Sequence, residues 1–359
     1  MADVSWAIHM AVLPQTGIGV VNATLDATTT SATTSDGLVL GDADSGDAGS
    51  GITIPNFERI TKAVADIGLT KQFDTFLRTA VSNLAITIPL KGNGVVSTPS
   101  AGQALPLAGV DALLQAAGFV SANGSSPTVN YTPRISATSP STRYVTVKIW
   151  IGSGGDGMSW ELLDCICESA AFELTPGGLC LATFSVAVGS VDEFNTGLTL
   201  GTFDYGTQAT LSAPVVQGVA AAWAPAGTLS VSPDHGFSTL TITSNQSIED
   251  IPDANQAAGV RKIQTERSFD VAGTMFGFSG DEDAHYQNLI QTTAPTGDLV
   301  FQVGTIAGAA QTINAYRFDV RNIQLSSVKP NKAGSVLTVE IEGHCTGLTE
   351  GSEFELRFN

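Results

Sequence analysis

Three aspartates, Asp42, Asp44 and Asp47, lie close together in the segment GDADSGD, with a spacing that faintly resembles a calcium-binding loop. An EF-hand loop also needs a glycine at its sixth position and a bidentate glutamate at its twelfth. The segment meets neither requirement. We therefore interpret it as a solvated acidic loop rather than a metal site.

Two of the four cysteines form a Cys-x-Cys pair, Cys165 and Cys167, and the other two are Cys180 and Cys345. Structural zinc sites usually combine Cys-x-x-Cys spacing with further cysteines or histidines. Neither Cys-x-x-Cys nor a close pair of histidines occurs in the sequence. Because a buried free cysteine behaves as a small hydrophobic side chain, we expect core thiols and no metal.

Other residue types that could support catalysis are scattered. The four histidines (His9, His235, His285 and His344) are far apart in the sequence, and no Gly-x-Ser-x-Gly marks a nucleophile. Residues 152–157 (GSGGDG) superficially resemble a phosphate loop but lack the Lys-Ser/Thr ending, so we interpret them as a turn. We therefore expect no catalytic residues, no cofactor and no enzyme activity.

Glu340 and Glu342 are the carboxylates whose position is most suggestive. They alternate with apolar residues in the stretch Leu337, Val339 and Ile341, which predicts a strand with one buried face. On the other face, the two glutamates are candidates to line an internal passage or a subunit interface. The alternative is an ordinary solvated strand face.

The elements that position these residues follow a pattern that occurs twice. The helical stripe of Val110, Leu113 and Leu114 reappears as Tyr286, Leu289 and Ile290. Each stripe lies between strand-like runs, at 84–90 and 144–151 in the first half and at 272–278 and 299–303 in the second. Each half closes with two more runs, 165–172 and 181–188, then 318–325 and 336–341.

This shared order predicts one fold used twice, with domains at 1–196 and 197–359. In the alignment, Cys165 and Cys167 match Phe318 and Val320 on an inward strand face. The first copy carries three longer segments, predicted as loops at 23–51, 91–107 and 121–143. We also expect a short helix at 60–67, a Gly-containing boundary segment at 191–207 and an acidic loop at 245–256.

Composition and charge narrow the choice of function. Of 359 residues, 43% are hydrophobic and only 14% are charged, which favours a folded chain with much surface in contact with other protein. The net charge is −18, and residues 1–200 and 201–359 each hold 17 acids and 8 bases. A chain this acidic repels DNA rather than binding its phosphates. The amino terminus does not resemble a secretory signal and no apolar run is long enough to span a membrane, so we expect maturation in a cytoplasm.

The residues 267–345 resemble a known family. They run from RSFDVAGTMFGFSGDEDAHYQNLI through LVFQVG to YRFDVRNIQLSSVKPNKAGSVLTVEIEG. A strand ending in glycine, a short helix, a strand, a Tyr/Phe strand, a Lys-Pro/Gly turn and a closing Thr/Glu strand are similar to the major tail tube protein of long-tailed bacteriophages. The first half shares the pattern more weakly, through its alignment with the second.

The resemblance implies a mainly β fold in which each copy is a β-sandwich or partly closed barrel flanked by one short helix. It also implies subunits that join their sheets into a ring with an inner β-barrel, and rings that stack into a tube. Most members use six single-domain chains per ring, so a duplicated chain implies three chains with pseudo-six-fold symmetry. Glu340 and Glu342 would then be lumenal or interface acids, and Asp36, Asp42, Asp44 and Asp47 would belong to a loop between rings.

The implied partners are other copies of the chain, a tape measure protein inside the tube during assembly, and tail terminator and distal tail proteins at its ends. Genomic DNA would pass through without specific binding, and no membrane would be involved. The protein would be assembled in the host bacterial cytoplasm and reside in the virion tail. Two alternatives stay open: another phage assembly protein, such as a capsid, decoration or tail-hub component, and a β-sandwich that binds glycans.

Overall fold

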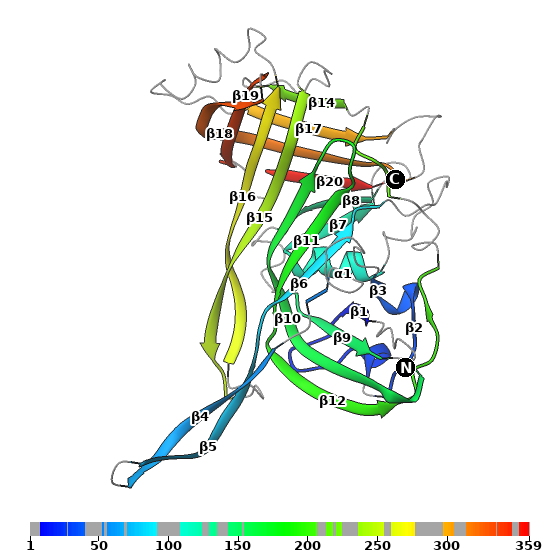
Figure 1. The fold of residues 1–359 in the computed structure, drawn as a ribbon, viewed down its shortest axis with the longest axis vertical. Helices are drawn as coiled ribbons and strands as arrows, with labels where there is room; N and C mark the ends of the chain where they lie inside the picture. The colour runs from blue at the N-terminus through cyan, green and yellow to red at the C-terminus, as the bar shows by residue number, and fades with distance from the viewer. Residues whose placement is uncertain are drawn as a thin grey trace.

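The computed structural model describes residues 8–26, 28–39, 52–53, 56–67, 70–91, 108–123, 129–134, 143–152, 154–206, 213–217, 220–224, 236–254, 260–276, 297–304, 314–334, 336–346 and 352–358. The fold is mainly β, as the sequence predicted, and its large antiparallel sheet is not closed into a barrel (Figure 1). That sheet has 16 strands, and two separate pairs, β13–β2 and β4–β5, complete the described strands.

The first half contains most of the short elements. Its strands are β1 (Ile8–Pro14), β2 (Ala32–Thr33), β3 (Leu38–Val39), β4 (Phe57–Ile67), β5 (Thr70–Val81), β6 (Leu84–Pro89), β7 (Phe119–Asn123), β8 (Val129–Pro133), β9 (Val145–Ile151), β10 (Gly157–Leu174), β11 (Cys180–Ala187) and β12 (Ser190–Leu198). Its helical elements are η1 (Ala23–Leu25), η2 (Thr34–Asp36), α1 (Ala108–Ala116) and η3 (Gly154–Asp156).

The second half is built from longer strands. They are β13 (Phe203–Asp204), β14 (Ala220–Ala224), β15 (Gly236–Pro252), β16 (Val260–Phe276), β17 (Gly297–Val303), β18 (Tyr316–Ala333), β19 (Val336–Cys345) and β20 (Phe354–Phe358). The second predicted helical stripe, at residues 286–290, lies outside the described residues.

Helix α1 forms where the apolar stripe predicted it. Val110, Leu113 and Leu114 are all buried, and the helix packs against β1 and β7. Gly118 follows the last turn with a φ of 81°, a left-handed conformation that glycine adopts without steric cost. Its amide donates to the Gln115 carbonyl oxygen at 3.1 Å, which satisfies one of the carbonyls left open at the helix end.

One strand order occurs twice in the sheet. It is β1-β9-β10-β11-β6 in the first half and β14-β17-β18-β19-β16 in the second, and all neighbours are antiparallel. The first part of each long middle strand also pairs with a further strand, β10 with β12 and β18 with β20. The repeated hydrophobic pattern predicted one fold used twice, but it did not predict this order of strands in the sheet. The division into domains at residue 197 stays a prediction.

The register of strand pairing also repeats, including the positions of two bulges in β10 and in β18. In each strand two residues face one residue of the partner at the first bulge, 163–164 in β10 and 321–322 in β18. The second bulge falls between Cys167 and Ser169 in β10, and between Leu325 and Ser327 in β18. Residues 165–174 therefore correspond one by one to residues 323–332.

This register corrects the sequence alignment of the cysteines. Cys165 and Cys167 correspond to Ile323 and Leu325, not to Phe318 and Val320, which lie five residues earlier. The alignment was wrong because each bulge inserts an extra residue and reverses which side chains point inward. A prediction that assumes strict alternation of inward and outward side chains therefore fails beyond each bulge.

The two halves share one core. A single large hydrophobic cluster contains residues from β1 through β20. At its centre the Phe354 ring lies 5.3 Å from Phe119, 6.0 Å from Phe172, 5.2 Å from Phe269 and 6.1 Å from Phe318, measured between ring centroids. The C-terminal strand β20 also pairs with β8 of the first half. The sheet and the core thus join the halves closely.

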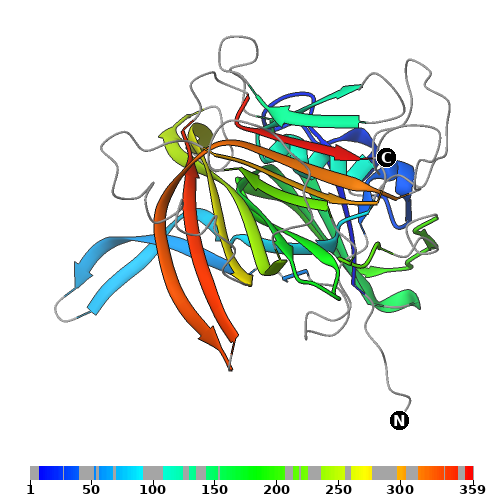
Figure 2. The same cartoon turned by 90° about the horizontal axis from the view of Figure 1, so that it is seen from above.

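Two long hairpins project from this body. β4 and β5 form one, and β15 and β16 form the other, which runs along the molecule in Figure 1. Figure 2 shows the β4–β5 hairpin and the far ends of β18 and β19 extending in different directions. The predicted helix at 60–67 is therefore wrong, because these residues pair with β5. Most of the predicted acidic loop at 245–256 is also strand, since β15 continues to Pro252.

The segments predicted as loops are more ordered than expected where the structure describes them. In 23–51, the side chains of Leu25, Ala32 and Leu38 are buried with Trp150 in a second cluster, so this stretch does build core. In 121–143, β7 and β8 form a hairpin with Tyr131 buried. Strand β12 takes up residues 191–198 of the predicted boundary segment 191–207, and the short strand β13 follows at Phe203–Asp204. Of 91–107, only Lys91 lies within the described residues.

Candidate functional site

The central strands form an arc with two chemically different faces. The arc runs β6-β11-β10-β15-β16-β19-β18, and every neighbouring pair in it is antiparallel. One face is core: Ile86, Phe184, Phe172, Ile242 and Ile341 are all 0–1% exposed. Because side chains alternate along a strand, the residues between these positions lie on the opposite face.

That opposite face, which we call the polar face, carries small hydroxyl and methyl side chains and a few carboxylates. Direct cross-strand pairs place its members together: Thr87, Ala171, Glu173, Thr183, Ser185, Thr239, Thr241, Thr243, Asp270, Ala272, Thr274, Lys329, Glu340 and Glu342. The Thr87 and Thr183 hydroxyls are hydrogen-bonded at 3.0 Å. None of these members is Phe, Tyr or Trp.

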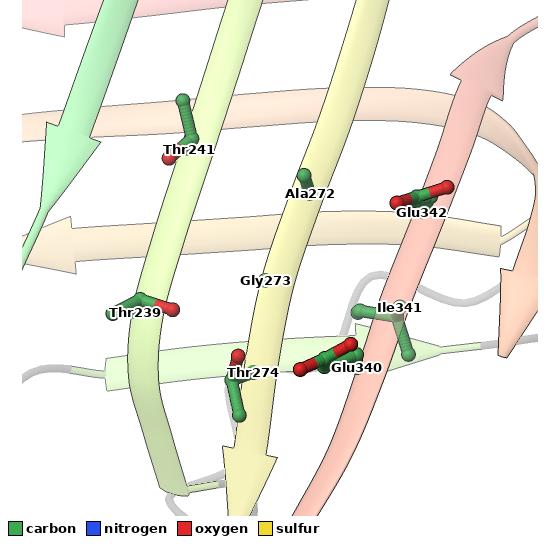
Figure 3. A pocket seen from close by; sticks show the side chains of 8 residues that line it. All are labelled: Thr239, Thr241, Ala272, Gly273, Thr274, Glu340, Ile341 and Glu342. Carbon is green, nitrogen blue, oxygen red and sulfur yellow. The ribbon is translucent and has the colours of Figure 1, made fainter. Parts of the chain in front are cut away.

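Glu340 and Glu342, the two glutamates singled out from the sequence, both lie on the polar face. Glu342 is opposite Ala272, and Glu340 is opposite Thr274 on β16 and Lys329 on β18. They line a depression of about 210 Å³ over β15, β16 and β19 (Figure 3). Its other lining residues are threonines, Ala272, Gly273 and Ile341. This lining offers carboxylates and hydroxyls to solvent.

The polar face has an excess of negative charge. Glu173, Asp270, Glu340 and Glu342 contribute carboxylates, and Lys329 contributes an ammonium group. The His344 ring nitrogen Nδ1 lies 2.5 Å from Asp270 Oδ1 on the same face. The matching residues of β11 are Thr183 and Ser185, where β19 has Glu340 and Glu342. The acids on β19 are therefore specific to the second half.

A buried ion pair lies outside the polar face, between β9 and β10. Lys148 Nζ is 3.4 Å from Glu161 Oε2, and their side chains are 0% and 2% exposed. Lys148 also donates a hydrogen bond to the Asp26 carbonyl oxygen. Burial raises the pKa of Glu161 to about 7, although the nearby ammonium acts in the opposite direction. Burial likewise lowers the pKa of Lys148. These contacts attach η1 to the sheet.

The matching position in the second half is also a buried acid. Asp319 corresponds to Glu161 in the register of β18 and is 0% exposed. Its carboxylate accepts a bond from Arg317 Nε at 2.9 Å, and Arg357 on β20 lies 3.4 Å away. The sequence did not predict that these two acids are buried, because an acid that alternates with apolar residues is normally expected on the solvent-exposed face of a strand.

The cysteines are placed as core residues. Cys165, Cys167 and Cys180 are buried, Cys345 is partly buried, and all four are free. Burial raises the pKa of every one of these thiols, that of Cys345 to about 12, which disfavours the reactive thiolate. Within the described ranges, no group of three or more His, Cys, Asp or Glu side chains is arranged to hold a metal ion.

The remaining sequence candidates have local roles or lie outside the described residues. Asp36 Oδ2 accepts hydrogen bonds from the Thr33 amide at 2.9 Å and the Thr33 hydroxyl at 2.7 Å, and these bonds close the turn formed by η2. Asp42, Asp44 and Asp47 lie outside the described residues. The GSGGDG segment connects β9 to β10 through η3, as a turn should. His9 stacks on Phe203 with ring centroids 3.9 Å apart.

One feature that sequence reasoning missed is an open strand edge. From Ser327 to Ala333, β18 pairs with β19 on one side, and no described strand pairs with its other side. The matching part of β10, 169–174, has β11 on one side and β15 on the other. The Lys-Pro sequence at 329–330 was a usable signal, since both residue types are common on sheet edges.

No helix among the described residues has the length and hydrophobicity needed to cross a membrane. A scan against protein-family models finds no match to the chain, and a search of curated protein sequences finds none either.

Proposed function

We propose that this chain is a structural subunit of a phage tail tube. Three copies close into a ring with pseudo-six-fold symmetry, rings stack into a tube, and the polar face lines the channel for DNA. The observation that carries the proposal is the junction between β10 and β15. It joins two blocks of matching strand order and register edge to edge within one chain.

The geometry of that junction favours a closed assembly. The two blocks are β6-β11-β10, with the bridge at Ile52, and β15-β16-β19-β18. The operation that carries one block onto the equivalent block beside it includes a rotation. Repeating this operation generates either a closed ring or an open helix. The second block still has an open edge at β18 where another block can be added. Closure removes the exposed edges that would otherwise promote aggregation.

The chemistry of the polar face supports a channel for DNA. Duplex DNA binds proteins mainly through lysine and arginine contacts to its phosphates, and single strands also stack on aromatic rings. The polar face instead carries carboxylates and small hydroxyl side chains. A lining of this kind repels the phosphate backbone, so that DNA can move without being held. In this proposal a tape measure protein occupies the channel during assembly, and terminator and distal tail proteins bind the ends.

Native mass spectrometry of the purified chain tests the proposal. A subunit of 37.0 kDa should give species at three times that mass and at multiples of the trimer. A capsid, decoration or hub protein would stop at a defined oligomer without stacking. A monomer that persists at high concentration, together with specific capture of a glycan, would favour the glycan-binding alternative and contradict the proposal.

A further inference from the structure

The open edge of β18 has a counterpart inside the chain whose partner is visible. Residues 169–174 of β10 correspond to residues 327–332 of β18. In β10 that stretch pairs with β15, with Ser169 opposite Asn245 and Leu174 opposite Leu240. If both halves use their edges alike, the partner of β18 is the first-half equivalent of β15.

That equivalent can be located from the register. β6 corresponds to the end of β16, because Leu84 and Val271 pair with matching residues of β11 and β19. Ile52 bridges to Ile86 in the first half, as Leu240 pairs with Gly273 in the second. Phe57 pairs with Val81, as Asn245 pairs with Ser268. The described residues 52–53 and 56–57 therefore match residues 240–241 and 244–245.

We infer that the open edge of β18 in one chain pairs antiparallel with the stretch of a second copy of the same chain that holds the described residues 52–53 and 56–57. The register is transferred from the β10–β15 junction. For the described residues it places Ser327 opposite Phe57, Val328 opposite Asn56, Asn331 opposite Thr53 and Lys332 opposite Ile52. This inference rests on the proposed function and deepens it, since it names the partner and the residue pairs that close the ring.

The partner has to lie in another chain. In the described structure, Ile52 and Thr53 lie at the β6 end of the arc, where Thr53 N donates to the Ala85 carbonyl oxygen at 3.0 Å. β18 forms the opposite end, with β11, β10, β15, β16 and β19 in between. Lys329, Pro330 and Lys332 are exposed on this edge. Lysine and proline on a sheet edge disfavour pairing with unrelated strands, so only a strand with complementary geometry is expected to pair here.

Cysteine crosslinking in assembled material tests the register. In the double variant Thr53→Cys with Asn331→Cys, the two new thiols face each other across the junction on the polar face, within disulfide reach. The control is Thr53→Cys with Lys332→Cys. Lys332 is next to Asn331 in β18, so its side chain points to the opposite face of the sheet and away from that of Thr53. Mild oxidation should convert most of the first variant to a covalent trimer and at least tenfold less of the control. Reactions with wild-type protein measure the background from Cys345.

The outcomes separate the register from the function. Rings that form but give no crosslink in the first variant, or that crosslink the control equally well, overturn the inferred register and leave the tube function standing. A chain that forms no rings and gives no intermolecular disulfide overturns both. Mixing the two single variants, Thr53→Cys and Asn331→Cys, adds a direct check, because only mixed dimers should appear.

Discussion

Asp164 and Asn322 hold the left-handed backbone conformation at the same bulge of two matching strands, with φ angles of 52° and 55°. Such φ values are uncommon for residues other than glycine, and aspartate and asparagine tolerate them best. At this bulge β10 passes from the partners β9 and β12 to the partners β11 and β15. At the matching bulge β18 passes from β17 and β20 to β19, with no described strand on its other side. The same local solution thus positions the arc in both halves.

Changing Asn322 to valine should destabilise the protein by about 2 kcal/mol, because a β-branched side chain is strained at positive φ. The matched control is Asn322→Gly, which accepts this conformation and should stay within about 1 kcal/mol of wild type. Urea denaturation of both variants measures the difference. Equal stability of the two would show that the bulge does not need the left-handed conformation.

Removing the Glu161 charge should change how stability depends on pH. Because burial raises the folded-state pKa of Glu161 to about 7, the folded protein binds more protons than the unfolded chain between about pH 4.5 and pH 7. This residue's contribution to stability is complete below that window and is lost as the pH rises through it. In the variant Glu161→Gln that loss should disappear, on the order of 3 kcal/mol relative to wild type. Thermal unfolding of wild type and variant, measured at a series of pH values, tests this prediction. Parallel plots of stability against pH for the two proteins would contradict it.

Truncating Phe354 should weaken both halves together. Its ring contacts Phe119 and Phe172 of the first half and Phe269 and Phe318 of the second. Phe354→Ala should cost about 3–5 kcal/mol and leave a single unfolding transition. The control Val120→Ala, at a residue that is 41% exposed, should cost less than about 1 kcal/mol. Two separated transitions in calorimetry would mean that the halves fold independently.

Reversing the charge at Glu340 and Glu342 should make assembled tubes retain DNA. The double change to lysine places positive charge on the polar face, and phosphate binding then rises steeply at low salt, on the order of tenfold. Asp156→Lys is a control with charge reversed at an exposed turn away from the polar face. Co-sedimentation of labelled duplex DNA with tubes measures retention. Equal retention by the double variant and the control would place these glutamates outside the channel.

The sequence predicted the elements whose signals are local. The stripe of Val110, Leu113 and Leu114 identified α1, and Gly118 marked its end. The strand-like runs at 144–151, 181–188 and 336–341 identified β9, β11 and β19. Elements defined by long-range pairing were not predictable in this way. Residues 60–67 have helical spacing, yet pairing with β5 makes them strand. Burial of Leu25 and Leu38 depends on Trp150, which is more than a hundred residues away.

The candidate site was predicted in part. Alternation in β19 placed Glu340 and Glu342 on the face opposite Val339 and Ile341, as the structure has them. The neighbours of the two glutamates on β15 and β16 could not be predicted, because sheet order is set by contacts distant in sequence. The open edge of β18 became visible only from the comparison with β10, since an edge is a property of the assembled sheet.

End-on electron microscope images of the purified chain test the central claim most directly. Closure of three chains predicts hollow annuli or stacked tubes, with six similar lobes around an open channel and true three-fold symmetry after averaging. A compact monomer at high concentration, or closed particles without a channel, would contradict it.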